Sequence, residues 1–412
     1  MGDIYTGIDL GTDSIKIVVA EKDKDKYHVL YSGCSTSSGI ENGFIVDMKS
    51  ATNCVRDCLN NANEALGIKI SKVVACVPPN GCNMDIVEGS VEVEDTNNIS
   101  GNDVSKVLHD ALKNVDFSEN ELVTAMPINF NIDDDVSVHD PKGMHGNVLN
   151  ARVVISTTAK ESLYRILEVL KLAGVETVDI CYSSFGDYYS LEDKRYDELV
   201  GAIINIGEES TNVAIFNRGI QIKNGLVPVG SRHVDADLSY ALKCNMDTAR
   251  NIKELFSVAV SSYADISDVL DVDSEGENGV EKKSVNQVTV SKIVEARLKE
   301  ILNIAKNEIK NLTNREIRYI IITGGISELA GFQYLIEQEF GFTAKVCNIP
   351  TMGIRHNKYS SCFGIIKYFN DKLDLRGKHY NMFTEEELDS LINNDSSIDD
   401  AVSKVFGHFF DD

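Results

Sequence analysis

Two stretches of the sequence share one pattern and decide the fold. Residues 9–19 read DLGTDSIKIVV, and residues 205–215 read NIGEESTNVAI. Each stretch is an apolar strand, a polar turn with glycine and a second apolar strand, so that Gly11 aligns with Gly207 and Ser14 with Ser210. This pattern is typical of a β-hairpin. Because each hairpin opens one half of the chain, the sequence predicts a duplicated α/β architecture with a cleft between the halves.

The composition is that of a folded, acidic protein. The 412 residues include 40 Lys and Arg against 64 Asp and Glu, which gives a net charge of −24, and 43% of the residues are apolar. A chain of this length and apolar content can form two or more packed domains. The negative charge argues against nucleic acid as a partner, because phosphate backbones are bound through basic patches.

Several features predict a cytoplasmic location. No run approaches the roughly 18 apolar residues of a membrane-spanning helix. The first residues, MGDIYTGIDL, do not have the basic and apolar regions of a signal peptide. The nine cysteines are scattered and form no C-x-x-C pair, which indicates reduced thiols.

The pattern of the chain changes within each half. Residues 80 to about 160 alternate apolar and polar side chains around one helical stretch, which predicts a small α+β module inserted into the first half. Seven acids in residues 264–283 show little periodicity and predict an exposed acidic loop. The predicted domains are residues 1–190 with the insertion at about 80–160, residues 191–377 with a smaller subdomain at about 245–310, and a tail at 378–412.

The two glycine turns have the chemistry of a phosphate site. A tight turn leaves several backbone N–H groups pointing into a concavity that suits a phosphate oxygen. The hydroxyls of Thr12, Ser14, Ser210 and Thr211 could add donors, and Lys16 a positive charge. Asp9 could hold a divalent cation through water. A single turn of this kind also fits a purely structural hairpin, whereas two matched turns favour a site between them.

A third element follows a predicted buried strand at residues 319–323. The stretch TGGIS at 323–327 places two glycines directly after that strand. Without a Cβ, the backbone there can lie against an adenine or a ribose.

In this order, the three elements resemble the nucleotide segments of the actin, sugar-kinase and heat-shock-chaperone superfamily. The chain is more closely similar to the bacterial FtsA family of cell division proteins. That resemblance spans the whole chain and rests on PKGMHG (141–146) with LNARV (149–153), VPVG (227–230) with DADLS (235–239), and the helix 291–310 with Arg297 and Glu300.

The resemblance implies an actin-like, ribonuclease-H-like fold of two domains with an inserted subdomain and a C-terminal amphipathic helix. It implies ATP and Mg²⁺ as cofactors, with Asp9 as the metal residue. The residues expected to contact the nucleotide are Gly11, Thr12, Asp13, Ser14, Lys16, Gly207, Glu208, Ser210, Thr211, Gly230, Lys253, Gly324, Gly325 and Ile326.

Three positions depart from the family pattern. Asn205 and Asn212 stand where the second phosphate segment usually has Asp, and Arg250 stands where relatives often have Glu. An Asn side chain keeps its hydrogen bonds but cannot act as a general base or a strong magnesium ligand. We therefore expect ATP binding with weak or absent hydrolysis.

The tail ends in a stretch with helical periodicity. At about 100° per residue its large apolar side chains fall on one stripe. Such a helix either lies in a membrane surface as an anchor or docks on a protein. The proposed membrane-binding residues are Ile398, Val402, Val405, Phe406, Phe409 and Phe410.

By resemblance, the protein is expected to polymerise with itself and to tether the FtsZ ring to the inner face of the membrane at the division site. Membrane lipid and later division proteins would be further partners. Two alternatives are a pilus or secretion assembly adaptor of related fold and a phosphotransferase of the same superfamily. The tail helix argues against the first, and Asn205 argues against the second.

Overall fold

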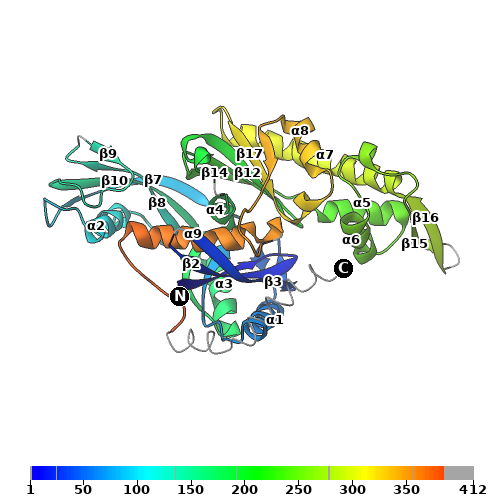
Figure 1. Ribbon diagram of the computed structural model, residues 1–412, viewed down its shortest axis with the longest axis horizontal. Coiled ribbons are helices and arrows are strands. Elements are labelled where there is room, and N and C mark those ends of the chain that lie inside the picture. The colour runs from blue at the N-terminus through cyan, green and yellow to red at the C-terminus, as the bar shows by residue number, and fades with distance from the viewer. Residues whose placement is uncertain are drawn as a thin grey trace, which may run out of the picture.

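The chain folds into two halves, each built around a five-stranded sheet, and a third sheet of four strands extends from the first half (Figure 1). The computed structural model describes residues 2–384 apart from residues 25, 135, 192, 277, 278 and 355. The membrane-binding residues predicted at 398–410 lie outside this range.

The first half contains a mixed sheet with the strand order β11-β6-β1-β2-β3. β1 and β2 form the predicted antiparallel hairpin, and β6 runs parallel both to β1 and to β11. The elements are β1 (Asp3–Leu10), β2 (Ser14–Asp23), β3 (Lys26–Thr36), β4 (Ile40–Glu41), β5 (Phe44–Ile45), α1 (Met48–Leu66), β6 (Lys72–Val77), α3 (Lys160–Ala173), β11 (Glu176–Tyr182) and α4 (Ser183–Tyr189).

Helix α1 illustrates how local sequence sets these elements. Asp47 accepts hydrogen bonds from the first amides, and Gly67 ends the helix in the left-handed conformation with φ 69°. Between these caps, Ala51, Val55 and Ala62 lie on the buried face. Their spacing in the sequence, about one apolar position per helical turn, is what places them on one face of α1.

The second half repeats the first. Its strand order is β14-β13-β12-β17-β18, with β12 and β13 as the antiparallel hairpin and β17 parallel both to β12 and to β18. The predicted duplication is therefore confirmed. The elements are η1 (Lys194–Glu198), β12 (Val200–Ile206), β13 (Thr211–Asn217), β14 (Ile220–Val227), α7 (Gln287–Leu312), β17 (Tyr319–Thr323), η3 (Gly325–Glu328), α8 (Phe332–Phe340), β18 (Ala344–Val346), η4 (Asn357–Tyr359) and α9 (Ser360–Leu375).

The predicted α+β insertion is a separate layer at one end of the molecule (Figure 1). Its sheet has the order β7-β10-β8-β9, and helix α2 packs on β7 and β10 around a core of its own. The elements are β7 (Asn83–Glu92), α2 (Gly101–Leu112), β8 (Asn120–Ile132), β9 (Val136–Val138) and β10 (Val148–Ala159).

At the opposite end, a small helical unit carries a β-hairpin where the sequence predicts an acidic loop (Figure 1). That prediction is wrong for most of the segment, because Asp271, Asp273, Glu275 and Glu281 belong to two antiparallel strands. Leu270 faces Val285 in the ladder, and Val272 and Val285 are buried against the helices. The elements are α5 (Arg232–Leu242), α6 (Met246–Leu255), η2 (Ser261–Tyr263), β15 (Val269–Gly276) and β16 (Gly279–Asn286).

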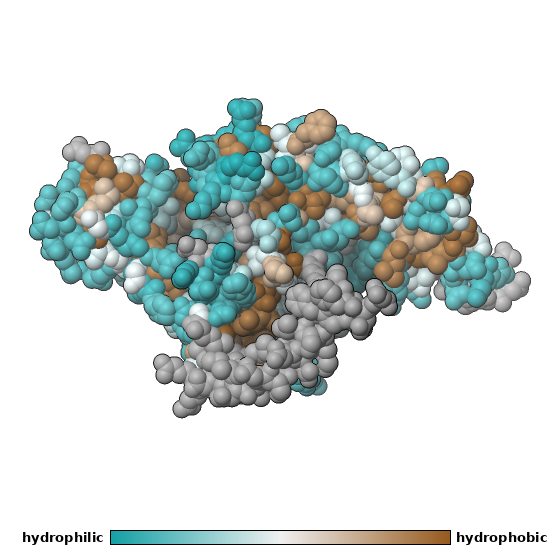
Figure 2. Space-filling model, in the orientation of Figure 1, coloured by the Kyte–Doolittle hydropathy of each residue, from teal (hydrophilic) through white to brown (hydrophobic). Residues whose placement is uncertain are grey.

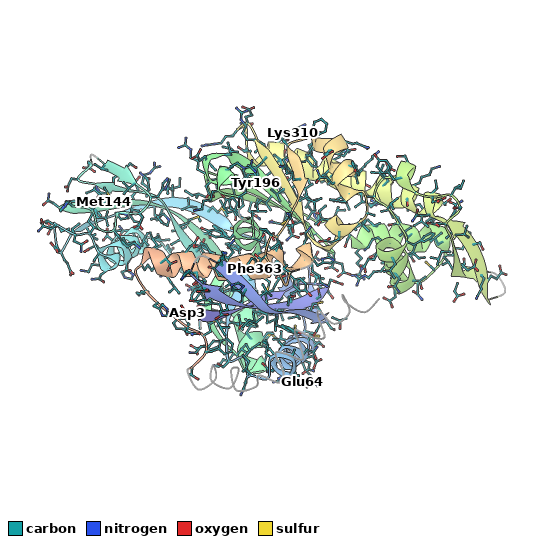
Figure 3. All side chains as sticks on the ribbon, viewed as in Figure 1. Asp3, Glu64, Met144, Tyr196, Lys310 and Phe363 are labelled. Carbon is teal, nitrogen blue, oxygen red and sulfur yellow. The ribbon has the colours of Figure 1, made fainter. Side chains whose placement is uncertain are left out.

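Helices α4 and α9 lie between the two large sheets and form the connections between the halves. Figure 3 shows Phe363 of α9 at this central position, where its side chain is fully buried. The two helices approach so closely that a Cβ at Gly364 would lie 1.7 Å from the carbonyl oxygen of Gly186. Glycine at both positions allows this backbone contact.

The chain after α9 returns along β1. Tyr5 Oη donates to the carbonyl of Tyr380, and Met382 and Phe383 are buried in the core of the first half. The first residues of the tail predicted at 378–412 therefore pack on the first half.

Candidate functional site

The two matched turns face each other across one cleft of about 570 Å³ between the halves. In both turns the glycine amide donates to the serine carbonyl, over 3.2 Å from Gly11 to Ser14 and 3.0 Å from Gly207 to Ser210. A Cβ on Gly11 or Gly207 would lie 2.9 Å or 3.0 Å from the same serine oxygen. The turns therefore have the same closed geometry, and both depend on glycine.

The structure brings most of the predicted contact residues to this cleft. Two predicted residues, Thr211 and Gly230, do not line it. The hydroxyl of Thr211 donates to the carbonyl of Val229, and Gly230 packs against the backbone of Glu208. The predicted residues that do line the cleft are Asp9, Gly11, Thr12, Asp13, Ser14, Lys16, Gly207, Glu208, Ser210, Lys253, Gly324, Gly325 and Ile326.

The third predicted element closes the side of the cleft that belongs to the second half. Gly324 has φ 99°, and a Cβ there would lie 2.3 Å from the carbonyl oxygen of Ile206. Only glycine combines this conformation with so close an approach. As a result, the turn after β17 presents its backbone to the cleft next to the second hairpin.

The base of the first hairpin carries an ion pair. Lys16 Nζ lies 3.1 Å from Asp9 Oδ2 and donates to the carbonyl of Ser14. Burial opposes the charge on Lys16, but the carboxylates of Asp9 and Asp13 together outweigh it, so the pKa of Lys16 lies above its ordinary value. Lys16 is thus held fully charged at the floor of the cleft.

Arg250 on α6 connects the two turns. Its Nη1 lies 2.7 Å from Asp13 in the first turn, and its Nη2 pairs with Glu208 in the second. Burial raises the pKa of Glu208, and the nearby charge of Asp13 adds to this, while Arg250 opposes it. The guanidinium therefore holds together two carboxylates that would otherwise repel each other across the cleft.

A second cation of α6 lies deeper. Lys253 Nζ lies 2.7 Å from Asp235 Oδ1, and both side chains are almost fully buried. Burial raises the pKa of Asp235, although Lys253 acts to lower it. The pair fixes α6 against α5 at the wall of the cleft.

The second hairpin has no such pair at its base. Asp9 faces Lys16 in the β1–β2 ladder, whereas the matching positions of β12 and β13 are Asn205 and Asn212. Oδ1 of Asn212 is buried, and no group in the described part of the chain donates to it. The base of the second hairpin therefore offers neutral amides where the base of the first offers charges.

A buried carboxylate that no sequence motif marks lies behind Asn205. Asp187 on α4 accepts hydrogen bonds from Asn205 Nδ2 at 2.8 Å and from the hydroxyls of Ser360 and Ser361 at 2.6 and 2.7 Å. Burial raises the pKa of Asp187 to about 6, although these three donors act to lower it. The sequence signal that could have indicated this site is that Asp187 is the one charged residue in an otherwise uncharged stretch.

The arrangement suits a phosphorylated ligand rather than an isolated metal ion. Among the described residues, no group of three or more His, Cys, Asp or Glu side chains is placed to hold a metal. The cleft instead combines backbone amides, Lys16 and an acidic rim that a divalent cation could bridge to phosphate oxygens.

The fold places this chain among the actin-like proteins with two domains. Two solved structures share this fold. The PilM–PilN type IV pilus biogenesis complex matches with a TM-score of 0.60 and 13% identity, covering 88% of this chain and 98% of that chain. MreB5 of Spiroplasma citri bound to ADP matches with a TM-score of 0.57 and 12% identity, covering 90% and 98%.

At identities this low, the two likenesses establish the shared fold and nothing about activity.

Sequence comparisons identify the family within this class. The family model described as "Cell division protein FtsA" matches residues 202–364, and the model of the SHS2 domain inserted in FtsA matches residues 81–157. The curated FtsA of Staphylococcus epidermidis is 27% identical over 94% of this chain and 84% of its own length. The FtsA of Bacillus subtilis is 26% identical over 93% of this chain and 88% of its own length. The chain belongs to the FtsA family of cell division proteins.

No helix within the described range is both long and apolar enough to span a bilayer.

Proposed function

We propose that this protein binds ATP with Mg²⁺ in the cleft, polymerises as an actin-like filament, and tethers the FtsZ ring to the inner face of the cell membrane. Later division proteins would be recruited to the same filament. The observation that carries this proposal is the pair of matched glycine turns that face each other across one cleft in a chain of the FtsA family.

The chemistry of the cleft supports a nucleotide with a divalent cation. The turn amides and the charged Lys16 would bind phosphate oxygens. Asp9 in the cleft lining suits Mg²⁺, which keeps most of its waters and takes one or two protein ligands. The cation would neutralise charge between phosphates and the acidic rim. Because Asn205 and Asn212 cannot serve as bases, we expect slow hydrolysis at most.

The FtsZ contact is proposed for the smaller subdomain at about residues 245–310. Several large apolar side chains are exposed there, and Figure 2 shows apolar surface on this face beside the β15–β16 hairpin. Apolar side chains of this kind form the centres of protein interfaces. They are Leu255, Tyr263, Ile266 and Val269.

The membrane contact is proposed for the apolar stripe at residues 398–410. The charged residues in this stretch include two acids, Asp399 and Asp400, and one base, Lys404. An acidic segment gains nothing from anionic lipid, so apolar burial would drive the binding. Polymerisation would then strengthen it, because many weak anchors on one filament act together.

Co-sedimentation with liposomes tests the proposal. The full chain is compared with a chain that ends at Asn394, each with and without ATP and Mg²⁺, on neutral vesicles and on vesicles of rising anionic content. We expect the full chain to sediment with both vesicle types, more strongly with ATP and Mg²⁺, and the shorter chain to stay in solution. Equal behaviour of the two chains would refute the anchor, and binding only to anionic vesicles would refute its apolar basis.

A further inference from the structure

Asp187 lies one side chain behind the wall of the cleft, at the point where the two halves are connected. It belongs to α4, from which the chain enters the second half, and it accepts hydrogen bonds from Ser360 and Ser361 at the start of α9, by which the chain returns. Its third donor is Asn205, which lines the cleft at the end of β12. One carboxylate thus joins both connections to the second phosphate turn.

The repeat within the fold shows how the charges are distributed. β1 of the first half corresponds to β12 of the second, so Asp9 corresponds to Asn205. Helix α4 corresponds to α9, and their contact at Gly186 and Gly364 aligns Asp187 with Ile365. Helix α9 packs on β1, and α4 packs on β12. Next to β1, the strand therefore carries the carboxylate and the packed helix an apolar residue. Next to β12, the strand carries an amide and the packed helix the carboxylate.

The hydrogen bonds fix the orientation of the amide between them. A carboxylate that accepts from two serine hydroxyls can only accept from Asn205 as well, so Nδ2 must face Asp187. Oδ1 of Asn205 then lies on the side of Gly324, where an added Cβ would be 3.1 Å from it. Gly324 also lines the cleft, so this arrangement leaves the amide oxygen as the acceptor next to a bound ligand.

We propose that Asp187 is a positioning residue of the nucleotide site, which places behind Asn205 the carboxylate that the end of β12 lacks. It orients the Asn205 oxygen toward Gly324 in the cleft lining, and its hydrogen bonds would couple a ligand in the cleft to α4 and α9. This inference rests on the proposed binding of ATP with Mg²⁺. It requires one carboxylate at this place, on either residue 187 or residue 205.

The test is a charge-swap series in the full-length protein. Asp187→Asn leaves no carboxylate, Asn205→Asp leaves two within hydrogen-bond distance, and the double variant moves the single carboxylate to the strand. The readout is the factor by which Mg²⁺ strengthens the affinity for a fluorescent ATP analogue. In Asp187→Asn we expect this factor to be about tenfold smaller than in the wild-type protein, which is within the usual range of coupling between two ligands. The double variant should recover it to within about threefold.

A matched control is Asp179→Asn, which removes a carboxylate that pairs with Lys372 of α9 at 2.6 Å, outside the cleft lining. It should leave the magnesium factor unchanged. If Asp187→Asn alters only the unfolding temperature, or if the double variant fails to recover the factor while remaining folded, the inference is wrong. If the wild-type protein binds no ATP analogue at all, the proposed function itself fails, and the wild-type measurement distinguishes that result from the others.

Discussion

Replacing Arg250 with alanine should loosen the contact between the two turns. Arg250 Nη1 lies 2.7 Å from Asp13, Nη2 pairs with Glu208, and Nε lies 3.8 Å from Asp235. The exposed fractions of these three carboxylate side chains are 46%, 14% and 1%. The contributions of the three contacts therefore differ.

The size of the effect follows from this exposure. The exposed pair with Asp13 contributes about 0.2–1 kcal/mol, and a charged hydrogen bond to the largely buried Glu208 contributes about 1.5–3 kcal/mol. Asp235 keeps Lys253 as a partner at 2.7 Å and adds little. Because water can enter and hydrate Glu208 in the variant, we expect a loss of about 2 kcal/mol. For a domain of 150–250 residues this corresponds to a fall in Tm of about 4–8 °C.

Thermal unfolding and hydrogen exchange measure the two consequences. Arg250→Ala should lower the Tm and speed amide exchange at residues 11–14 and 207–210. Asp13→Asn removes only the pair across the cleft, so it should cost less than about 1 kcal/mol and lose its effect at high salt.

The control is Arg297→Ala, which removes another arginine of the second half that pairs with two carboxylates, Asp237 and Glu300. It should lower the Tm without changing exchange in the turns. If Arg250→Ala unfolds at the wild-type temperature with wild-type exchange in both turns, the reasoning is refuted.

Three further predictions follow from individual contacts. Burial raises the pKa of Asp187 from 3.8 to about 6. The free energy of unfolding should therefore fall by up to about 3 kcal/mol as the pH rises between these two values. In urea titrations from pH 4 to 7, the Asp187→Asn variant should not show this fall. Gly364→Ala places a Cβ 1.7 Å from the Gly186 oxygen, so it should force α4 and α9 apart and lower the free energy of unfolding by about 3 kcal/mol in the same assay. Lys16→Met keeps the volume but removes the charge next to Asp9, so the affinity for a fluorescent ATP analogue should fall by about 10–100-fold, the value of one charged hydrogen bond. An unchanged value in any of these measurements would contradict the corresponding contact.

The parts of the fold that could be predicted from sequence are those set by local physics. The hairpin turns were visible because Gly11 and Gly207 sit between alternating apolar strands. Helix α1 was visible because its buried positions recur at helical spacing. Both signals involve residues close together in the chain, so no knowledge of distant contacts was needed.

The features that escaped depend on contacts between distant residues. Asp187 is bound by Ser360 and Ser361, which lie more than one hundred and seventy positions along the chain, and no local pattern indicates such a partner. In the β15–β16 hairpin, Val272 is buried while its neighbours Asp271 and Asp273 are not. Buried and exposed side chains alternate over only a few residues there, and the many acids make this strand pattern hard to recognise without the helices that cover the valines.

The unequal charges of the two hairpins bear on what the nucleotide does. Asp9 and Lys16 neutralise each other in the first half, and Asn205 and Asn212 are neutral in the second. A bound triphosphate would therefore meet donors on both sides but no carboxylate at residue 205 that could remove a proton from water. Asp187 lies behind that wall and contacts both connections between the halves. A site that senses the ligand at the connections but lacks a base at its surface is suited to stabilising a closed state, and its binding energy would then set the filament affinity rather than the rate of hydrolysis.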